Sequence, residues 1–181
     1  MKITAVCGSP REGSTLSMIE NILHLIKAHD ENIETELIMV ARRNIRHCEG
    51  CCDCEEDGKC GIRDEMEEIN KIIAESDALI FGSPTYFDNV TGMMKDFIDR
   101  TNPLLKDSIL KGKAVAVVAV GSFNVLSVNK AVENLRSFCA THNMYEVGYL
   151  GALNSSLGNG VVLNEMVKIA KELVNALKKK R

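Results

Sequence analysis

Five of the seven cysteines lie close together in the stretch CEGCCDCEEDGKC, residues 48–60. Four of them follow the spacing C-x2-C-x2-C-x5-C, namely Cys48, Cys51, Cys54 and Cys60. Compact cysteine runs are typical of iron–sulfur ligation. Zinc remains an alternative because a tetrahedral site also needs only four thiolates, although zinc ribbons separate their two cysteine pairs by about 15–20 residues. The fifth cysteine, Cys52, directly follows Cys51, so we give it no ligand role.

The composition is that of an ordinary globular protein, and its length suits one domain spanning residues 1–181. The formal net charge is -3, which argues against a nucleic-acid-binding protein. No apolar stretch approaches the roughly 18 residues of a membrane span. The apolar run at the N-terminus is too short for a signal peptide, so we expect a cytoplasmic protein. In a reducing cytosol, clustered cysteines favour metal binding or catalysis over disulfides.

Short apolar runs alternate with segments of helical periodicity along the chain, which predicts an α/β fold. Strands are expected over residues 2–8, 34–40, 78–84, 114–121 and 144–151. A helix is expected after each strand. The helix after the second strand follows Asp64 as its N-cap, and the helix after the fourth strand begins near Ser127. Parallel strands joined in this way bind ligands beyond their carboxyl ends. The loops after the first, third and fourth strands are therefore the predicted site.

The first of these loops, GSPREGST at residues 8–15, leads directly into a predicted helix. Backbone amides at a helix N-terminus attract phosphate. Hydroxyl groups from Ser9, Ser14 and Thr15, and the charge of Arg11, add further donors. The alternative is a plain strand–helix turn with Ser14 as its N-cap.

The second loop, GSPTYFDNVTG at residues 82–92, places Tyr86 and Phe87 at a strand end in a chain with few aromatic residues. A flat aromatic ligand would explain that placement, and the alternative is a pair of aromatic side chains that caps the core. Pro84 stiffens the turn, and amides around Thr85 could bind the edge of a heterocycle. In the third loop, residues 121–124, Gly121 permits close approach of the backbone.

Together these loops resemble those of the flavodoxin-like NAD(P)H-dependent FMN reductase superfamily, and GSPTYFDNVTGMMKDFIDR (82–100) is similar to its second signature. The resemblance implies a flavodoxin-like, doubly wound, five-stranded parallel sheet with helices on both faces and FMN as cofactor. The implied phosphate contacts are Ser9, Arg11, Ser14 and Thr15, with Leu16 beside them. The implied contacts to the ribityl chain or the ring are Pro84, Thr85, Tyr86, Phe87, Asn89 and Gly121.

The cysteine spacing, inserted after the second strand of such a fold, resembles that of the iron–sulfur flavoprotein family. This resemblance implies that Cys48, Cys51, Cys54 and Cys60 bind a 4Fe–4S cluster near FMN. It also implies an electron-transfer oxidoreductase whose donor is a ferredoxin-like carrier or NAD(P)H. The implied acceptor is a small molecule such as oxygen, a peroxide or a quinone, and the implied assembly is a homodimer or homotetramer.

Two other functions remain open from the sequence. One is a cluster-free NAD(P)H-dependent FMN or quinone reductase whose cysteines are structural or bind zinc. The other is a redox or metal sensor in which oxidation of the cysteines changes a binding surface. The absorbance spectrum of protein purified without oxygen separates these hypotheses, because flavin and cluster absorb differently.

Overall fold

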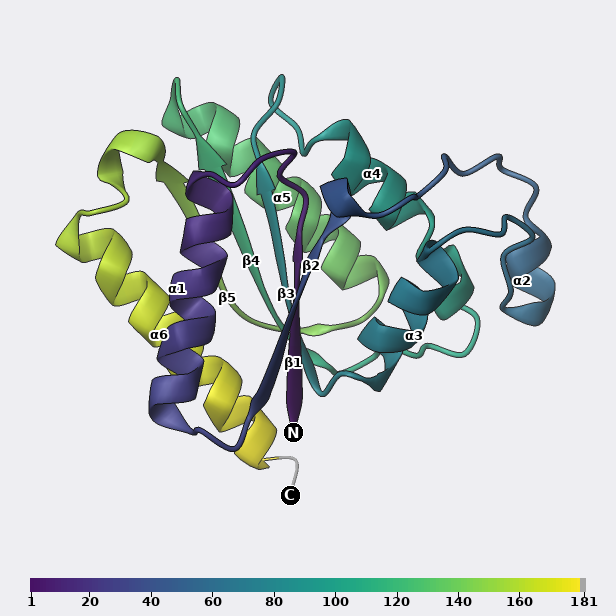
Figure 1. Cartoon of the computed structure of the whole chain (residues 1–181), viewed down its shortest axis with the longest axis horizontal. Coiled ribbons are helices and arrows are strands. Elements are labelled where there is room, and N and C mark those ends of the chain that lie inside the picture. Colours follow the sequence, from purple (N-terminus) through teal and green to yellow (C-terminus); the bar gives the residue numbers. More distant parts are fainter. Residues whose placement is uncertain (180–181) are drawn as a thin grey trace.

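The computed structural model describes residues 1–179, and its centre is an all-parallel sheet of five strands (Figure 1). The strands are β1 (Lys2–Cys7), β2 (Glu34–Met39), β3 (Ala78–Pro84), β4 (Ala114–Gly121) and β5 (Tyr145–Leu153). All five predicted strands are confirmed, each within two residues at both ends. Every residue of β4 is buried, as its continuous apolar sequence predicts for a strand covered on both faces.

The strand order β2-β1-β3-β4-β5 creates a switch point in the middle of the sheet. The chain leaves β1 toward β2 on one side and then crosses back to β3 on the other side. The connection that leaves β1 and the connection that leaves β3 therefore run to opposite sides of the sheet. Their separation opens a crevice at the carboxyl edge, between β1 and β3. The loops after β1, β3 and β4 all end at that edge.

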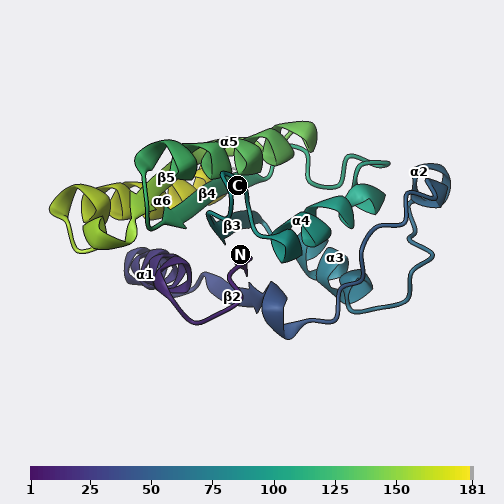
Figure 2. The same cartoon turned by 90° about the horizontal axis from the view of Figure 1, so that it is seen from above.

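Helices cover both faces of the sheet (Figures 1 and 2). On one face lie α1 (Ser14–His29) and α6 (Gly160–Lys179), whose apolar sides pack on β1, β4 and β5. On the other face lie α3 (Met66–Glu75), α4 (Gly92–Asp99) and α5 (Val125–Thr141). Two separate apolar cores result, one on each side of the sheet. Within residues 1–179, none of the helices combines the length and apolar character needed to cross a bilayer.

The structure corrects three local expectations. A short helix, α2 (Asp53–Asp57), lies inside the cysteine stretch, where none was predicted. The helix α5 begins at Val125 because the side chain of Asn124 caps it by accepting a bond from the amide of Ser127 at 2.7 Å. The helix α3 begins at Met66 after Glu65, although Asp64 does accept a bond from the Met66 amide at 3.0 Å.

Candidate functional site

A pocket of about 720 Å³ lies at the carboxyl edge of the sheet, where the sequence predicted the ligand. It brings together nine of the predicted residues, namely Ser9, Arg11, Ser14, Thr15, Pro84, Thr85, Tyr86, Phe87 and Gly121. It also includes residues that the sequence analysis did not single out, among them Asp88, Ser122, Phe123, Ser127 and Asn154. The predicted loops after β1, β3 and β4 therefore form one cavity.

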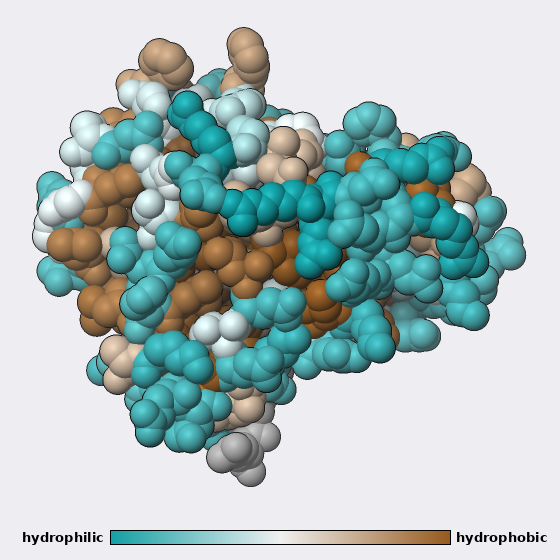
Figure 3. All heavy atoms as spheres, in the orientation of Figure 1, coloured by the Kyte–Doolittle hydropathy of each residue, from teal (hydrophilic) through white to brown (hydrophobic). Residues whose placement is uncertain are grey.

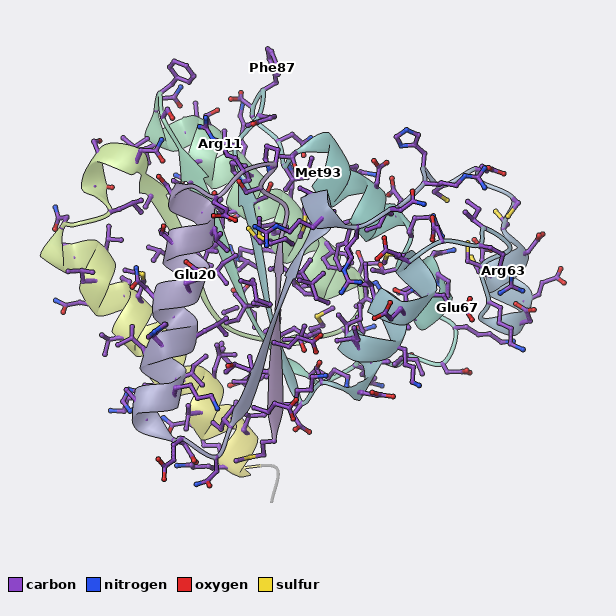
Figure 4. The ribbon with its side chains drawn as sticks, in the orientation of Figure 1. Arg11, Glu20, Arg63, Glu67, Phe87 and Met93 are labelled. Atoms are coloured by element: carbon purple, nitrogen blue, oxygen red, sulfur yellow. The ribbon has the colours of Figure 1, made fainter. Side chains whose placement is uncertain are left out.

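The first loop presents the N-terminus of α1 to this pocket. The residue before α1 is Gly13, so Ser14 is not the N-cap that the alternative interpretation of this loop required, and the cap position has no side chain to occupy the first-turn amides. Ser9 is buried, and its hydroxyl donates to the carbonyl oxygen of Arg11 at 2.7 Å, which shapes the loop. Arg11 itself is exposed and lies beside the start of α1 (Figure 4). Open amides, hydroxyl groups and a guanidinium at a helix N-terminus suit a phosphate.

The second loop is a tight hairpin whose tip projects from the molecule (Figure 4). Tyr86 and Asn89 exchange two backbone hydrogen bonds, at 2.9 and 3.0 Å. The two residues between them, Phe87 and Asp88, have φ angles of 48° and 63°, as a type I′ turn requires. Phe87 is fully exposed and Tyr86 is 47% exposed, so these rings do not cap the core. They stand instead at the rim of the pocket, where a flat ligand could stack.

Asp88 ties the tip of the second loop to α5. Its carboxylate accepts bonds from Lys130 Nζ, at 2.6 Å, and from the Ser127 hydroxyl. These two bonds hold the pKa of Asp88 below its usual value. The charged hairpin tip is thereby fixed above the pocket.

The third loop closes the pocket by close backbone packing. A Cβ atom on Gly121 would lie 2.6 Å from Val128 Cγ2, so α5 can approach only because this residue is glycine. The second loop is joined to the end of β4, because the Thr85 amide donates to the Val120 carbonyl at 2.9 Å. Asn154, which follows β5, donates to the Ser122 hydroxyl at 2.7 Å. The loop after β5 thus joins the site, and the carboxyl-edge rule applied to the fifth strand would have found it.

Two predicted contact residues do not line this pocket. The side chain of Leu16 is 7% exposed and belongs to the apolar core beneath α1. The side chain of Asn89 turns away from the pocket and lines a separate cavity between α4 and α5. Its amide oxygen accepts bonds from the Val90 amide at 2.8 Å and from Asn134 at 2.9 Å.

All five cysteines of residues 48–60 line a second, much smaller cavity of about 50 Å³. They belong to a segment of little regular structure between β2 and α3, which lies far from the sheet in both ribbon views (Figures 1 and 2). Cys54, on α2, is buried, and Cys60 is half-buried. Cys52 has a φ angle of 63°, and its thiol donates to the Gly50 carbonyl at 3.6 Å. The surface of this lobe is mostly hydrophilic on the face that Figure 3 shows.

The inner wall of the cysteine cavity is built by the residues that follow α4. Arg100 is fully buried and forms a two-pronged ion pair with Asp64, with N–O distances of 2.7 and 2.9 Å. Burial opposes the charged form of Arg100, but the bonds to Asp64 and the nearby Cys60 raise its pKa. Burial likewise opposes the charge on Asp64, yet Arg100 and two backbone amides hold its pKa below the usual value. The side-chain amide of Asn102 donates to Cys54 Sγ at 3.1 Å.

The chemistry of this donor set fits a cluster. A cubane distributes its four thiolate ligands over four iron atoms, so it needs cysteines around a cavity. Within residues 1–179, His, Cys, Asp and Glu side chains do not gather in a group of three or more that could hold a single metal ion. Arg100 lines the cavity. Its Nε atom is buried and has no hydrogen-bond partner within residues 1–179.

The model of the NADPH-dependent FMN reductase family matches residues 1–156. The chain belongs to this family. Two curated proteins with sequences similar to this chain are named iron–sulfur flavoproteins. The protein of Methanocaldococcus jannaschii is 38% identical over 82% of this chain and 76% of its own length. The protein of Methanosarcina thermophila is 28% identical over 98% of this chain and 95% of its own length.

Solved structures show the same fold. A flavone reductase superposes with a TM-score of 0.77 at 19% identity, over 99% of this chain and 64% of that one. Flavodoxin 1 from Bacillus cereus superposes with a TM-score of 0.68 at 20% identity, over 97% of this chain and 98% of its own. The predicted flavodoxin-like fold is therefore confirmed. Together with the family assignment, the pocket identifies this family member as an FMN-dependent oxidoreductase.

Proposed function

We propose that this flavoprotein is an electron-transfer oxidoreductase that carries a 4Fe–4S cluster on Cys48, Cys51, Cys54 and Cys60 besides FMN. It exchanges electrons with a one-electron carrier of the ferredoxin type. The observation that carries the proposal is the position of α4. Its N-cap, Thr91, follows the hairpin of the flavin pocket by two residues and donates its amide to the Ser83 hydroxyl at 3.1 Å. The residues after its last turn line the cysteine cavity.

The two groups, when bound, would connect one-electron transfer at the cluster with two-electron chemistry at the flavin. The relatives named iron–sulfur flavoproteins support this pairing. Full reduction of a bound flavin would require two electrons and two protons, and two one-electron carriers would match that requirement. The protein's part is to bind, orient and shield both groups.

At the flavin pocket, Arg11 and the first-turn amides of α1 would hold the phosphate of FMN. Thr15, which is buried at the base of the pocket, would add a hydroxyl donor. The hairpin at Tyr86 and Phe87 would lie along the ring. The exposed rings of Phe87 and Phe123 leave an apolar rim, which suits a small-molecule acceptor such as a quinone, oxygen or a peroxide.

The same proposal includes assembly as a homodimer or homotetramer and a cytoplasmic location. Both are consistent with an exposed apolar rim around the pocket and with thiols that need a reducing compartment.

A second candidate function is a cluster-free NAD(P)H-dependent FMN or quinone reductase. The observation that favours it is the composition of the flavin pocket, which contains none of the five clustered cysteines among its lining residues in the described chain. Hydride transfer to FMN would then proceed without any metal group.

The test compares electron donors in wild-type protein and in a Cys54→Ser variant, both purified without oxygen. We expect the variant to retain FMN and any NAD(P)H-linked reduction, and to lose ferredoxin-linked reduction, measured as flavin bleaching by stopped flow. A Cys139→Ala variant is the control, because Cys139 is buried in the core beneath α5. Equal ferredoxin-linked rates in wild type and Cys54→Ser would contradict the proposal.

A further inference from the structure

Two residues after α4 line the cysteine cavity and carry hydrogen-bond donors, and neither is a candidate ligand. One is Arg100, with its buried guanidinium, and the other is Asn102, with its side-chain amide. Both follow directly from the last turn of a helix whose first turn is anchored at the flavin pocket. There, the Thr91 hydroxyl donates to the Gly8 carbonyl at 2.6 Å.

The guanidinium of Arg100 is fixed in place by four oxygen contacts. Nη1 donates to Asp64 Oδ2 at 2.7 Å and to the Arg46 carbonyl at 2.8 Å. Nη2 donates to Asp64 Oδ1 at 2.9 Å and to the Ile62 carbonyl at 3.4 Å. The remaining donor, Nε–H, is buried and lacks a partner within the described residues. A buried donor costs free energy unless an acceptor meets it, so this atom calls for an acceptor. The Cys60 thiol lies near enough to help raise the pKa of Arg100, so a sulfur atom on this side of the cavity is the available acceptor.

Asn102 already makes the contact that Arg100 Nε lacks. Its Nδ2 lies 3.1 Å from Cys54 Sγ, within the range of an N–H···S bond. Asn102 lies on a short 3-10 turn, Asn102–Leu104, which holds its side chain against α2. The amide of Asn102 thus donates to Cys54. Arg100 lines the same cavity as Cys60.

We propose that Arg100 and Asn102 are positioning residues that donate hydrogen bonds to the sulfur atoms of the cluster and raise its reduction potential. This inference rests on the proposed function. One-electron reduction adds a negative charge to the metal group, and N–H donors aimed at sulfur stabilise that added charge. Loss of a donor should therefore make the cluster harder to reduce.

The effect should come from directed N–H groups more than from net charge. Asp64 balances the charge of Arg100 within the same buried pair. An Arg100→Lys substitution keeps a cation beside Asp64 but removes Nε. An Asn102→Leu substitution removes the amide while keeping the branched shape and the number of side-chain heavy atoms.

The experiment is a reductive titration of the iron-loaded protein with a one-electron reductant, monitored by electron paramagnetic resonance. We expect each variant to reduce the equilibrium constant for cluster reduction about tenfold, a shift of about 59 mV to more negative potential for one electron. The flavin potential should stay unchanged. Iron and FMN contents are measured on the same samples.

The matched control is Asn70→Leu. This buried amide donates to the Arg100 carbonyl at 3.1 Å and thus contacts the same segment without being directed at a sulfur atom. It should lower thermal stability and leave the cluster potential unchanged.

Iron-loaded Asn102→Leu and Arg100→Lys proteins with wild-type potentials would overturn this inference alone. An equal shift in Asn70→Leu would also overturn it, by showing a general structural effect. A wild-type protein that binds no iron would overturn both the inference and the proposed function. If Arg100→Lys does not fold, Asn102→Leu decides the question.

Discussion

The flavin pocket and the cysteine cavity are built in opposite ways. The flavin pocket, of about 720 Å³, is shaped by loops that follow neighbouring parallel strands, so the sheet fixes its walls. The cysteine cavity, of about 50 Å³, lies in a segment of little regular structure outside the sheet. Its inner wall depends on a few polar contacts, chiefly those of Arg100, Asp64 and Asn102.

This difference predicts that the two sites are stabilised by different interactions. The shape of the flavin pocket follows from burial of the strands and should persist without its ligand. The cysteine segment has little apolar packing of its own, and metal binding commonly supplies folding free energy to such sites. Changes at one site should therefore leave the other largely intact, which the following substitutions examine.

The largest effect is expected from the cysteines. Replacing Cys48, Cys51, Cys54 or Cys60 by Ser should reduce iron from about four atoms per chain to nearly none, while FMN content stays unchanged. Cys52→Ser should keep its iron, because its thiol bonds to Gly50 instead. Iron and flavin analysis after anaerobic reconstitution measures both. Loss of iron from Cys52→Ser, with retention in one of the other four, would show that the ligand register is wrong.

The next effect concerns the buried ion pair behind the cysteines. Asp64→Ala leaves the charge of Arg100 buried without its carboxylate, which should cost about 3–5 kcal/mol in the free energy of unfolding. Urea unfolding measures this cost, and FMN binding to the folded variant should persist. The control is Glu67→Ala, which removes the exposed pair with Arg63 and should cost about 0.5 kcal/mol or less (Figure 4). If Asp64→Ala lowers the free energy of unfolding by less than about 1 kcal/mol, the buried ion pair does not stabilise the inner wall of the cysteine cavity.

Acid should destabilise the fold through His142, which is buried and whose Nε2 lies 3.1 Å from the Thr101 hydroxyl. Burial lowers the pKa of His142 to about 4, below the value of about 6.5 in an unfolded chain. Its stabilising contribution is therefore complete above pH 6.5 and is lost as pH falls toward 4. Between pH 7 and 4.5 the free energy of unfolding should fall by about 2 kcal/mol from this group.

Urea unfolding of wild type and His142→Gln at both pH values isolates that contribution, because the remaining histidines and the carboxyl groups are present in both proteins. The variant should lose less stability on acidification. Parallel losses in the two proteins would assign the acid sensitivity elsewhere.

The smallest effect is expected at the phosphate end of the flavin pocket. Arg11→Ala and Thr15→Val should each weaken FMN binding by about 10- to 100-fold, the loss of one strong hydrogen bond worth roughly 1.5–3 kcal/mol. Fluorescence titration of FMN measures the affinity, and iron content should not change. Lys27→Ala, at the other end of α1, is the control. Wild-type affinity in both pocket variants would remove this loop from the FMN site.

Much of this protein could be predicted from its sequence because the signals are local. Each strand is a short run of apolar residues, so its position and burial depend on neighbours along the chain. The aromatic pair in residues 82–92 and the cysteine spacing are likewise patterns within a few residues. These signals were enough to place the flavin loops at one edge of a parallel sheet.

The tertiary structure decided which side chains meet across long stretches of sequence. Local spacing predicts Asp64 as a helix cap, but folding also places it against Arg100, 36 positions later, in a buried ion pair. Leu16 and Asn89 lie next to pocket residues in sequence, yet their side chains turn into the core and a neighbouring cavity. Side-chain direction and long-range pairing depend on how α4 and α5 pack against the sheet, and no local pattern encodes that packing.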